Sequence, residues 1–484
     1  MQFLSVVAVV LALAWCDLAA PLDRVPPGYA IGAMLGAQSL LAFVAWRSSR
    51  RWVAWIDSGV DELSPLATDL DRGRRRWQLL ATLVSLVVVI AVDWCHLVHG
   101  WQFARIVPLA DDLLLLLPVL APLLVGWAFY FDVERSLVEV YGSRAIARPV
   151  PAGRMAYVGG ELRRQLGLLL VPLVLLLAMQ DFARLVHPDL LDGPQAGVFW
   201  LAAGALLFLI FPLTLRAAWA TTPLPAGELR ARLEALAARC HARLSDIRVL
   251  STSGGAANAA VAGPLRNLRY VFLTDTLLAR LTDDEIEAVF AHELGHVRHR
   301  HLALRLAVGF APCATWLAAR DWLLAQAAAF PIAGIEPGEA VRAALGTNPV
   351  DWCALALIVV ATASGFVWCS RRWEHEADLF ACRLLSRRET AGDSTAVGPH
   401  GFGRFAVALQ RLAAVNGQPT DRGGWQHASL ERRIDFLRQA AAWPELADRY
   451  ALCTRLVGAL LVGFAATGFA AIGWEIVRQV ATTL

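Results

Sequence analysis

Long apolar runs recur along the chain, and their lengths predict helices that cross a membrane. An α-helix rises 1.5 Å per residue, so about 20 apolar residues span the roughly 30 Å hydrocarbon core of a bilayer. Clean runs cover residues 28–46, 113–131, 196–215, 352–370 and 456–474, and the run 77–98 is nearly as good, although Asp93 interrupts it close to one end. Shorter or charge-interrupted runs cover 2–20, 166–186 and 302–330. The pattern predicts a mainly α, polytopic membrane protein with about seven to nine transmembrane helices.

The composition supports a membrane protein and argues against binding to nucleic acid. Of the 484 residues, 57% are hydrophobic and 18% are charged, whereas an average soluble protein is nearer half apolar and a quarter charged. The net charge is only +3, and the arginines are dispersed without interleaved aromatic residues, unlike a nucleic-acid-binding surface. The eight cysteines form no C-x-x-C pair, so we expect neither a disulfide framework nor a cysteine-based zinc site.

The arginines also predict the orientation in the membrane. They are concentrated in segments 47–76 and 132–164, while the loops that alternate with these segments are poor in arginine. Cytoplasmic loops of membrane proteins carry the excess of basic residues, so both segments are expected in the cytoplasm. Six predicted spans then return the chain to the cytoplasmic side near Arg216. We therefore expect a multi-pass protein of a bacterial inner membrane, with the polar region after residue 220 facing the cytoplasm.

Two polar segments interrupt the apolar pattern and predict a small water-facing α+β domain. In the first, residues 228–241 have leucines at helical spacing, and residues 246–251 and 269–274 have the pattern of short strands. Residues 253–264 are small and extended, and a helix begins at a capping box formed by Thr282 and Glu285. The predicted divisions are a membrane region of about six spans at 1–220, the two halves of the polar domain at 221–301 and 371–450, a transmembrane hairpin between them at 302–370, and a C-terminal transmembrane helix at 451–484.

The sequence AHELGHVRHRH contains an H-E-x-x-H motif on this last helix. His292 and His296 are four residues apart, so their side chains lie one turn apart on one face and can bind a single metal ion. Glu293 is placed to accept a proton from the attacking water. The motif predicts one Zn²⁺ per chain, with a polar helix and coincidental histidines as the alternative. His299 and His301 lie past the motif among arginines, so we expect them on a solvated or headgroup-facing surface.

A zinc site of this type needs a third protein ligand, and the sequence EHEAD offers one. On a helix, Glu374 and Asp378 share a face, while His375 and Glu376 point elsewhere. We therefore expect Glu374 to bind the metal and Asp378 to accept the free ring N–H of a liganding histidine. His375 is the competing candidate for the third ligand.

These motifs resemble those of the HtpX-like and CAAX-prenyl-protease-like membrane zinc metalloproteases, metallopeptidase family forty-eight. The resemblance covers roughly residues 225–440 and rests on ANAAVAG, RYVFLTDTLLARLTDDEIEAVFAHELGHVRHRH and SRRWEHEADLFA, and more weakly on HASLERRIDFL. The order of the motifs and the two predicted spans between H-E-x-x-H and E-x-x-x-D are similar to that family. The resemblance implies a zincin-like fold for the polar domain.

The resemblance also implies a role for each motif residue. Asn258-Ala259 corresponds to the N-A segment on the strand that edges the family's active-site cleft. The family's H-P-S motif appears as His427-Ala428-Ser429, without the proline, with Arg433 in the place of its arginine. The implied zinc ligands are His292, His296 and Glu374, and the implied catalytic residues are Glu293 as the base, Asp378 as the carboxylate behind a ligand, and His427 as a contact to the substrate or transition state.

The leading interpretation is a zinc metalloendopeptidase at the cytoplasmic surface of the lipid bilayer. A polypeptide substrate would pair as an added strand along the extended segment 255–262. Cleavage of misfolded or membrane-associated proteins is favoured over CAAX-type processing of prenylated proteins, because the two spans between the motifs are more similar to HtpX. The other alternative is a non-catalytic metal-binding sensor or transporter, which would have no need of the Glu293 carboxylate.

Overall fold

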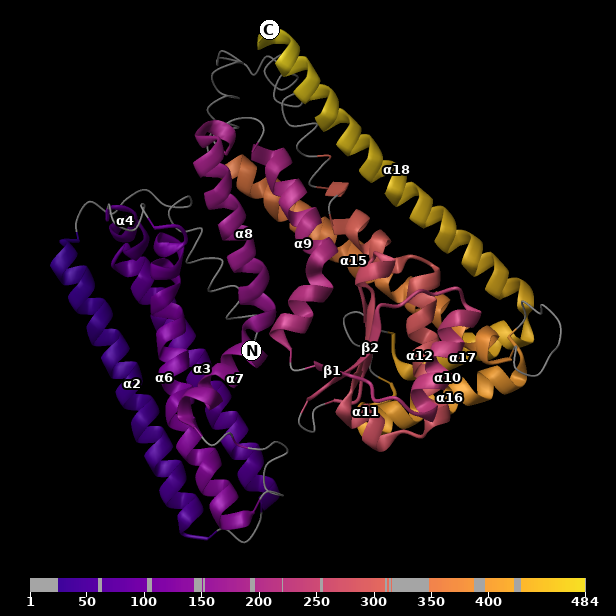
Figure 1. Ribbon diagram of the computed structural model, residues 1–484, viewed down its shortest axis with the longest axis horizontal. Helices are drawn as coiled ribbons and strands as arrows, with labels where there is room; N and C mark the ends of the chain where they lie inside the picture. The colour runs from indigo at the N-terminus through magenta and orange to yellow at the C-terminus, as the bar shows by residue number, and fades with distance from the viewer. Residues whose placement is uncertain are drawn as a thin grey trace, which may run out of the picture. The chain divides into compact units, whose positions relative to one another are not determined.

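The computed structural model is mostly helical with one small sheet (Figure 1). It describes residues 25–59, 63–101, 107–142, 150, 153–191, 196–219, 221–252, 256–309, 311–312, 315, 348–386, 397–421 and 428–483. The chain forms two compact units, Met1–Pro188 with Thr214–Ala220 and Asp189–Leu213 with Thr221–Leu484. The predicted fold class, a mainly α chain with apolar spans and a small α+β part, is confirmed.

The first unit is a group of long helices that pack through apolar side chains. They are α2 (Pro27–Asp57), α3 (Leu63–Ala91), α4 (Trp94–His99), α6 (Ala110–Tyr141), α7 (Arg154–Gln165) and α8 (Gly167–Val186). α2 packs along α6 and α3, which lie beside it in Figure 1. Pro122, inside α6, has no N–H to bond the carbonyl of Pro118. The Gln38 side chain of α2 donates to that carbonyl at 2.9 Å instead, so one helix supplies the bond that the other lacks.

Five described helices are long and apolar enough to cross a membrane: α2, α6, α8, α9 (Ala196–Ala218) and α18 (Pro444–Thr483). Each contains one of the predicted apolar runs. The run 352–370 lies within α15 (Asn348–Ser386). The run 2–20 lies outside the described residues, as does most of 302–330, of which residues up to 309 are helical. By these helices the chain is an integral membrane protein.

The predicted run 77–98 is not one continuous helix. α3 ends before Asp93, which adopts a left-handed φ of 52°, and α4 begins directly after it. The Asp93 carboxylate lies 2.6 Å from His96 Nδ1, and such local contacts compete with helix continuation. Cys95 lies beside this break and is disulfide-bonded, whereas the sequence predicts no disulfide framework. The free cysteines among the described residues are Cys240, Cys369, Cys382 and Cys453.

The second unit contains a four-stranded sheet of order β1-β2-β4-β3. Its strands are β1 (Thr221–Pro223), β2 (Asp246–Leu250), β3 (Ala259–Ala262) and β4 (Tyr270–Thr274). β2 and β4 are parallel, whereas β1 and β3 run antiparallel to their neighbours. The strands predicted at 246–251 and 269–274 are confirmed, and the extended segment 253–264 supplies β3. β3 is an edge strand, which is a template for pairing with another chain.

Helices enclose the main core of the second unit against this sheet. They are α10 (Glu228–Arg239), α11 (Asp275–Arg280), α12 (Asp283–Arg298), α15, α16 (Pro399–Val415), α17 (Leu430–Ala442) and α18. Leu233, Phe290 and Phe405 come from α10, α12 and α16 and are buried in one cluster with Ile247 of β2. α12 contacts α10, α15, α16 and β3. α12, which carries the H-E-x-x-H motif, is therefore the central helix of this unit.

Candidate metal centre and active site

The rotation of α12 is fixed by its start and by its buried face. At the start, the Thr282 hydroxyl accepts from the Glu285 N–H at 3.4 Å, and the Glu285 carboxylate accepts from the Thr282 N–H at 2.8 Å, which confirms the predicted capping box. An apolar stripe that faces a core sets the direction of the other side chains of a helix. Here it directs His292 and His296 toward α15. The stripe consists of the buried residues Ile286, Val289, Phe290 and Val297.

Gly295, within the motif, allows α12 and α15 to approach closely. A Cβ atom at this position would lie 2.9 Å from the Cα atom of Ala377 and 3.1 Å from its carbonyl oxygen. Interiors are packed too densely to absorb such contacts without movement of a helix. Ala377 lies about one turn after Glu374. The missing side chain at Gly295 therefore brings Glu374 to the two histidines.

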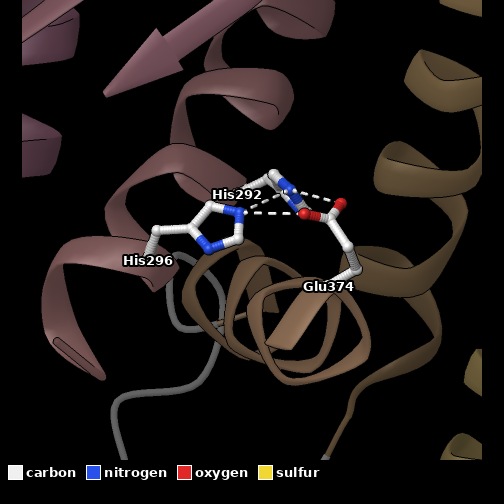
Figure 2. A group of neighbouring side chains, drawn as sticks. All are labelled: His292, His296 and Glu374. Atoms are coloured by element: carbon white, nitrogen blue, oxygen red, sulfur yellow. Dashed lines mark hydrogen bonds and ion pairs between the residues drawn. The ribbon is translucent and has the colours of Figure 1, made fainter. Parts of the chain in front are cut away.

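His292, His296 and Glu374 are buried and turn their ligand atoms toward one point (Figure 2). The two Nε2 atoms are 3.3 Å apart, and the Glu374 oxygens lie 3.5 Å and 3.4 Å from Nε2 of His292 and of His296. Zinc holds nitrogen and oxygen ligands at about 2.0–2.2 Å in a tetrahedron, which separates neighbouring ligand atoms by roughly 3.3–3.6 Å. The donor types and their spacing therefore fit a zinc ion.

Asp378 lies behind His292 and is held by Arg433. Its Oδ1 atom is 2.8 Å from His292 Nδ1, and Arg433 donates from Nε and Nη2 to its two oxygens at 2.8 Å and 2.6 Å. Burial alone would raise the pKa of Asp378, but the Arg433 guanidinium outweighs burial and holds this pKa well below its usual range. Burial alone would lower the pKa of His292, but the carboxylates of Asp378 and Glu374 outweigh burial and raise this pKa to about 10. The metal-free pocket therefore favours a positive charge.

Glu293 directly follows His292 on α12, and its carboxylate contacts the edge strand β3. Its Oε2 atom accepts from the Val261 N–H at 2.9 Å, and the residue is 9% exposed. Val261 lies opposite Val271 of β4, yet its N–H points outward from the sheet, toward α12. The carboxylate predicted to be the base thus faces the outer side of β3. This strand lies within the predicted substrate segment 255–262, of which 256–262 is described.

His301 contradicts its sequence-based prediction, because it is fully buried and not on a solvated surface. The chain turns after α12 at Arg300, whose φ is 57°, and this turn directs His301 back beneath the motif. His301 Nδ1 lies 2.8 Å from His296 Nδ1, and its Nε2 lies 3.0 Å from Glu376 Oε2. The His299 side chain is 29% exposed, and its Nδ1 lies 3.2 Å from Glu376 Oε1.

His375, a further candidate, does not join the described ligand group. The His375 ring packs against the rings of Phe436 and Tyr450, with centroid distances of 4.6 Å and 6.0 Å. Successive side chains on a helix point about 100° apart, so His375 and Glu374 leave α15 in different directions. His427 lies outside the described residues, and its role stays a prediction.

Two residues with clear contacts at the site were not identified from the sequence. The Asn416 side chain accepts from the Ala257 N–H at 2.8 Å and donates to the Ala257 carbonyl at 2.9 Å, which anchors the segment before β3. Glu376 is buried and contacts His301, 75 residues away in the chain. Glu376 belongs to the EHEAD sequence but points away from the predicted ligand face, and Asn416 belongs to no motif. Each contact depends on how distant segments pack, so neither contact follows from the sequence.

Comparisons with known proteins concern the same part of the chain. Residues 223–439 match the model of Peptidase family M48. The CAAX prenyl protease 1 homolog of Oryza sativa subsp. japonica is 37% identical over 117 residues, covering 22% of this chain and 27% of that protein. Protease HtpX of Pseudomonas fluorescens is 30% identical over 203 residues, covering 38% of this chain and 62% of that protein. The crystal structure of S. mikatae Ste24p is 19% identical, with a TM-score of 0.46 over 85% of this chain and 99% of that chain.

These matches are partial, because the chain spans less than two thirds of the length of either curated relative. The family model matches the segment that contains the sheet, the H-E-x-x-H helix and the residues packed against it. The family resemblance inferred from the motifs is confirmed. Residues 223–439 of this chain are thus similar to peptidase family M48, in agreement with the motifs.

Proposed function

We propose that the protein is a membrane-embedded zinc metalloendopeptidase that hydrolyses peptide bonds of membrane-associated or misfolded membrane proteins at the cytoplasmic face. One observation carries the proposal. Glu293 directly follows His292 of a ligand group that fits zinc, and its carboxylate accepts a hydrogen bond from the outer side of the edge strand β3. A site that only stored or sensed a metal would have no use for a carboxylate between the metal pocket and a strand edge.

His292, His296 and Glu374 would hold the zinc ion. When bound, zinc would supply Lewis acidity to the scissile carbonyl and to the attacking water. Asp378 supports this set from behind, since its Oδ1 atom lies within reach of His292 Nδ1 and leaves Nε2 for the metal. Arg433 holds the Asp378 carboxylate by two hydrogen bonds. The orientation of the His292 ring is therefore supported by Asp378 and, behind it, by Arg433.

Glu293 would accept the proton of the attacking water and deliver it to the leaving amine. The substrate backbone would add to the outer side of β3, where Val261 presents its N–H. This pairing places an extended peptide along α12 and brings its carbonyl near Glu293. The substrate segment predicted at 255–262 and the base thereby become parts of one cleft.

The arginine-rich segments 47–76 and 132–164 support a cytoplasmic position for this domain in a bacterial inner membrane. In this proposal, 221–301 and 371–450 together form the zincin-like domain, and 302–370 is a transmembrane hairpin between them. A reporter protein fused after residue 388 should be cytoplasmic, and one fused after residue 336 should lie across the membrane. Finding both reporters on one side would contradict the hairpin.

HtpX-type substrates are favoured over prenylated proteins for two reasons. Two predicted spans separate the motifs, as in HtpX, and the match to the Pseudomonas protein covers more of this chain than the match to the Oryza protein. Processing of prenylated C-termini is the alternative that the name of the Oryza relative suggests. The two classes of substrate differ chemically, so one assay can separate them.

The proposal is tested with purified protein in detergent, incubated with unfolded membrane proteins and with prenylated peptides, with and without a chelator. We expect cleavage of the unfolded proteins that stops with the chelator and returns with added zinc. Glu293→Gln keeps the shape of the side chain but removes the proton acceptor, so cleavage should fall by about 10²–10⁴-fold with zinc retained. Unchanged cleavage by Glu293→Gln would refute the mechanism, and zinc binding without cleavage of any substrate would favour a sensor.

A further inference from the structure

Behind His296, on the side away from the ligand group, two buried side chains form a chain of polar contacts. His296 Nδ1 is 2.8 Å from His301 Nδ1, and His301 Nε2 is 3.0 Å from Glu376 Oε2. His301 is 0% exposed and Glu376 is 4% exposed. Buried polar atoms are costly unless they are hydrogen-bonded, so contacts of this length in the interior are bonds that the fold maintains.

The positions of the protons along the series His296–His301–Glu376 follow from one condition, that His296 Nε2 binds the metal. If His296 Nε2 binds a metal, it must be unprotonated, so the proton of that ring lies on Nδ1. Nδ1 then donates to His301 Nδ1, which must be the acceptor because only one proton fits between two nitrogens 2.8 Å apart. His301 therefore carries its proton on Nε2 and donates to the Glu376 carboxylate. With the protons placed in this way, each of the two contacts has one donor and one acceptor.

Packing holds His301 in this position. Its ring stacks on the fully buried Trp373, with a centroid distance of 5.6 Å and an interplanar angle of 20°. On another side it stacks on His299 at 5.7 Å and 20°. It meets the His296 ring nearly edge-on, at 5.1 Å and 70°. The ring has no room to swing away, so its nitrogen atoms remain directed at His296 and Glu376.

The two histidines of the motif are therefore supported in different ways. Behind His292 stands an anion, Asp378, within 2.8 Å of the ring. Behind His296 stands a second imidazole, and the anion, Glu376, comes only after it. Glu376 is two residues after Glu374 on α15, so one helix supplies both a ligand and the far end of this support.

We propose that His301 and Glu376 are positioning residues that hold His296 with its Nε2 lone pair directed at the metal. The inference rests on the proposed zinc site, and it assigns to these two buried residues a role that spacing in the sequence does not indicate. His301 acts through His296, and Glu376 acts through His301 by fixing which of its nitrogens carries the proton. Removal of either should weaken zinc binding without removing a ligand.

The test measures zinc affinity of the full chain in detergent, by competition with a chromophoric chelator. His301→Phe keeps a ring on Trp373 but removes the acceptor, so affinity should fall about 10–100-fold, as for other residues behind metal ligands. His301→Asn places an amide oxygen near the former Nδ1 atom and should recover most of the loss. His299→Phe is the matched control, because His299 contacts Glu376 and stacks on His301 but forms neither a hydrogen bond nor a ring contact with His296. Phe keeps a ring on His301, so zinc affinity should stay near that of the unmodified protein.

Glu376→Met is the second variant and keeps the side chain length while removing the far acceptor. It touches neither His296 nor the ligand group, so a loss of about tenfold or more in zinc affinity would show action through His301. If thermal melting shows that His301→Phe does not fold, the zinc affinity of Glu376→Met tests the inference instead. Unchanged zinc affinity in a folded His301→Phe or Glu376→Met protein would overturn the inference. The readout is zinc affinity and not cleavage, so failure of the protease proposal with normal zinc binding would be recognised separately.

Discussion

In the first unit, the buried carboxylate of Glu161 lies 2.8 Å from Arg74 Nη2, accepts from Gln165 at 2.5 Å and also accepts from Arg164. In the second unit, the buried carboxylate of Asp378 accepts two hydrogen bonds from Arg433. Both carboxylates are almost fully buried, and both are paired with arginine. The two clusters differ in what lies on the other side of the carboxylate.

Around Glu161 the partners are hydrogen-bond donors, and the two arginines balance the negative charge of the carboxylate. Around Asp378 the permanent charges do not balance, because Glu374 adds a second carboxylate beside the two imidazoles while Arg433 supplies one cation. In the metal-free pocket the second positive charge is a proton on His292, whose pKa is raised to about 10. Arg305 is also near Glu374, but at 4.0 Å and with its side chain one-third exposed, so its effect is weaker. The comparison teaches that a buried charge cluster is a candidate cation site when its own residues leave a negative charge unbalanced.

Removing the Glu374 carboxylate should have the largest effect. Glu374→Ala deletes one of the three proposed ligands, so zinc affinity should fall by more than the roughly 10–100-fold that supporting residues contribute. His375→Ala is the matched control on the same helix, because the His375 ring packs against Phe436 and Tyr450. Zinc content measured by mass spectrometry of both purified proteins checks the prediction. A greater loss in His375→Ala would require an imidazole as third ligand.

The second-largest expected effect is a difference in stability between variants of Arg433 and of Arg74. Arg433→Met leaves the Asp378 carboxylate buried without its cation, which typically destabilises a protein by about 3–5 kcal/mol. Arg74→Met should destabilise less, because Glu161 keeps Arg164 and Gln165 as donors. Thermal melting of the two variants in one detergent measures the difference. Equal destabilisation would show that the two clusters do not differ in the way described.

Acid titration sharpens the same comparison. The folded pKa of Asp378 is held below its unfolded value, so the unfolded chain binds the proton first. The stabilisation from the Arg433 pair is therefore complete above the unfolded aspartate pKa of about 3.9 and is lost as pH falls through the folded pKa. Unmodified protein should lose stability below about pH 4, whereas Arg433→Met should lack this part of the acid loss.

A smaller effect is expected where α12 meets α15. Gly295→Ala places a Cβ atom 2.9 Å from the Cα atom of Ala377, and overpacking of this kind costs about 1–3 kcal/mol. The shift should also separate Glu374 from the histidines and weaken zinc binding. Gly403→Ala on α16 is the control, since a Cβ atom there meets nothing within 4 Å. If both variants melt at the same temperature and bind zinc alike, the close approach is not what sets the ligand spacing.

Features that depend on nearby residues could be predicted from the sequence. The capping box at Thr282, the buried stripe of α12 and the strand at 270–274 all follow from local spacing and propensity. The shared face of Glu374 and Asp378 follows from helical phase, and the structure places both beside His292. Periodicity therefore accounts for the elements and for most of the ligand group, although the ligand roles themselves stay predictions.

Features that depend on distant segments could not be predicted. A histidine among arginines is usually solvated, yet the positive φ of Arg300 turns His301 inward against Trp373. The clasp of Ala257 by Asn416 joins residues 159 positions apart. In each case the deciding interaction is absent from the local pattern.

The hydrogen bond from Val261 to Glu293 has a consequence for timing. In the proposed mechanism, the N–H that an incoming peptide strand would use is bonded to Glu293 while no peptide is present. A carbonyl of the peptide would replace the carboxylate on this N–H, and the exchange would free Glu293 when a peptide bond has been aligned. Water does not pair with β3 as a strand does, so in this proposal only an extended backbone would release the base.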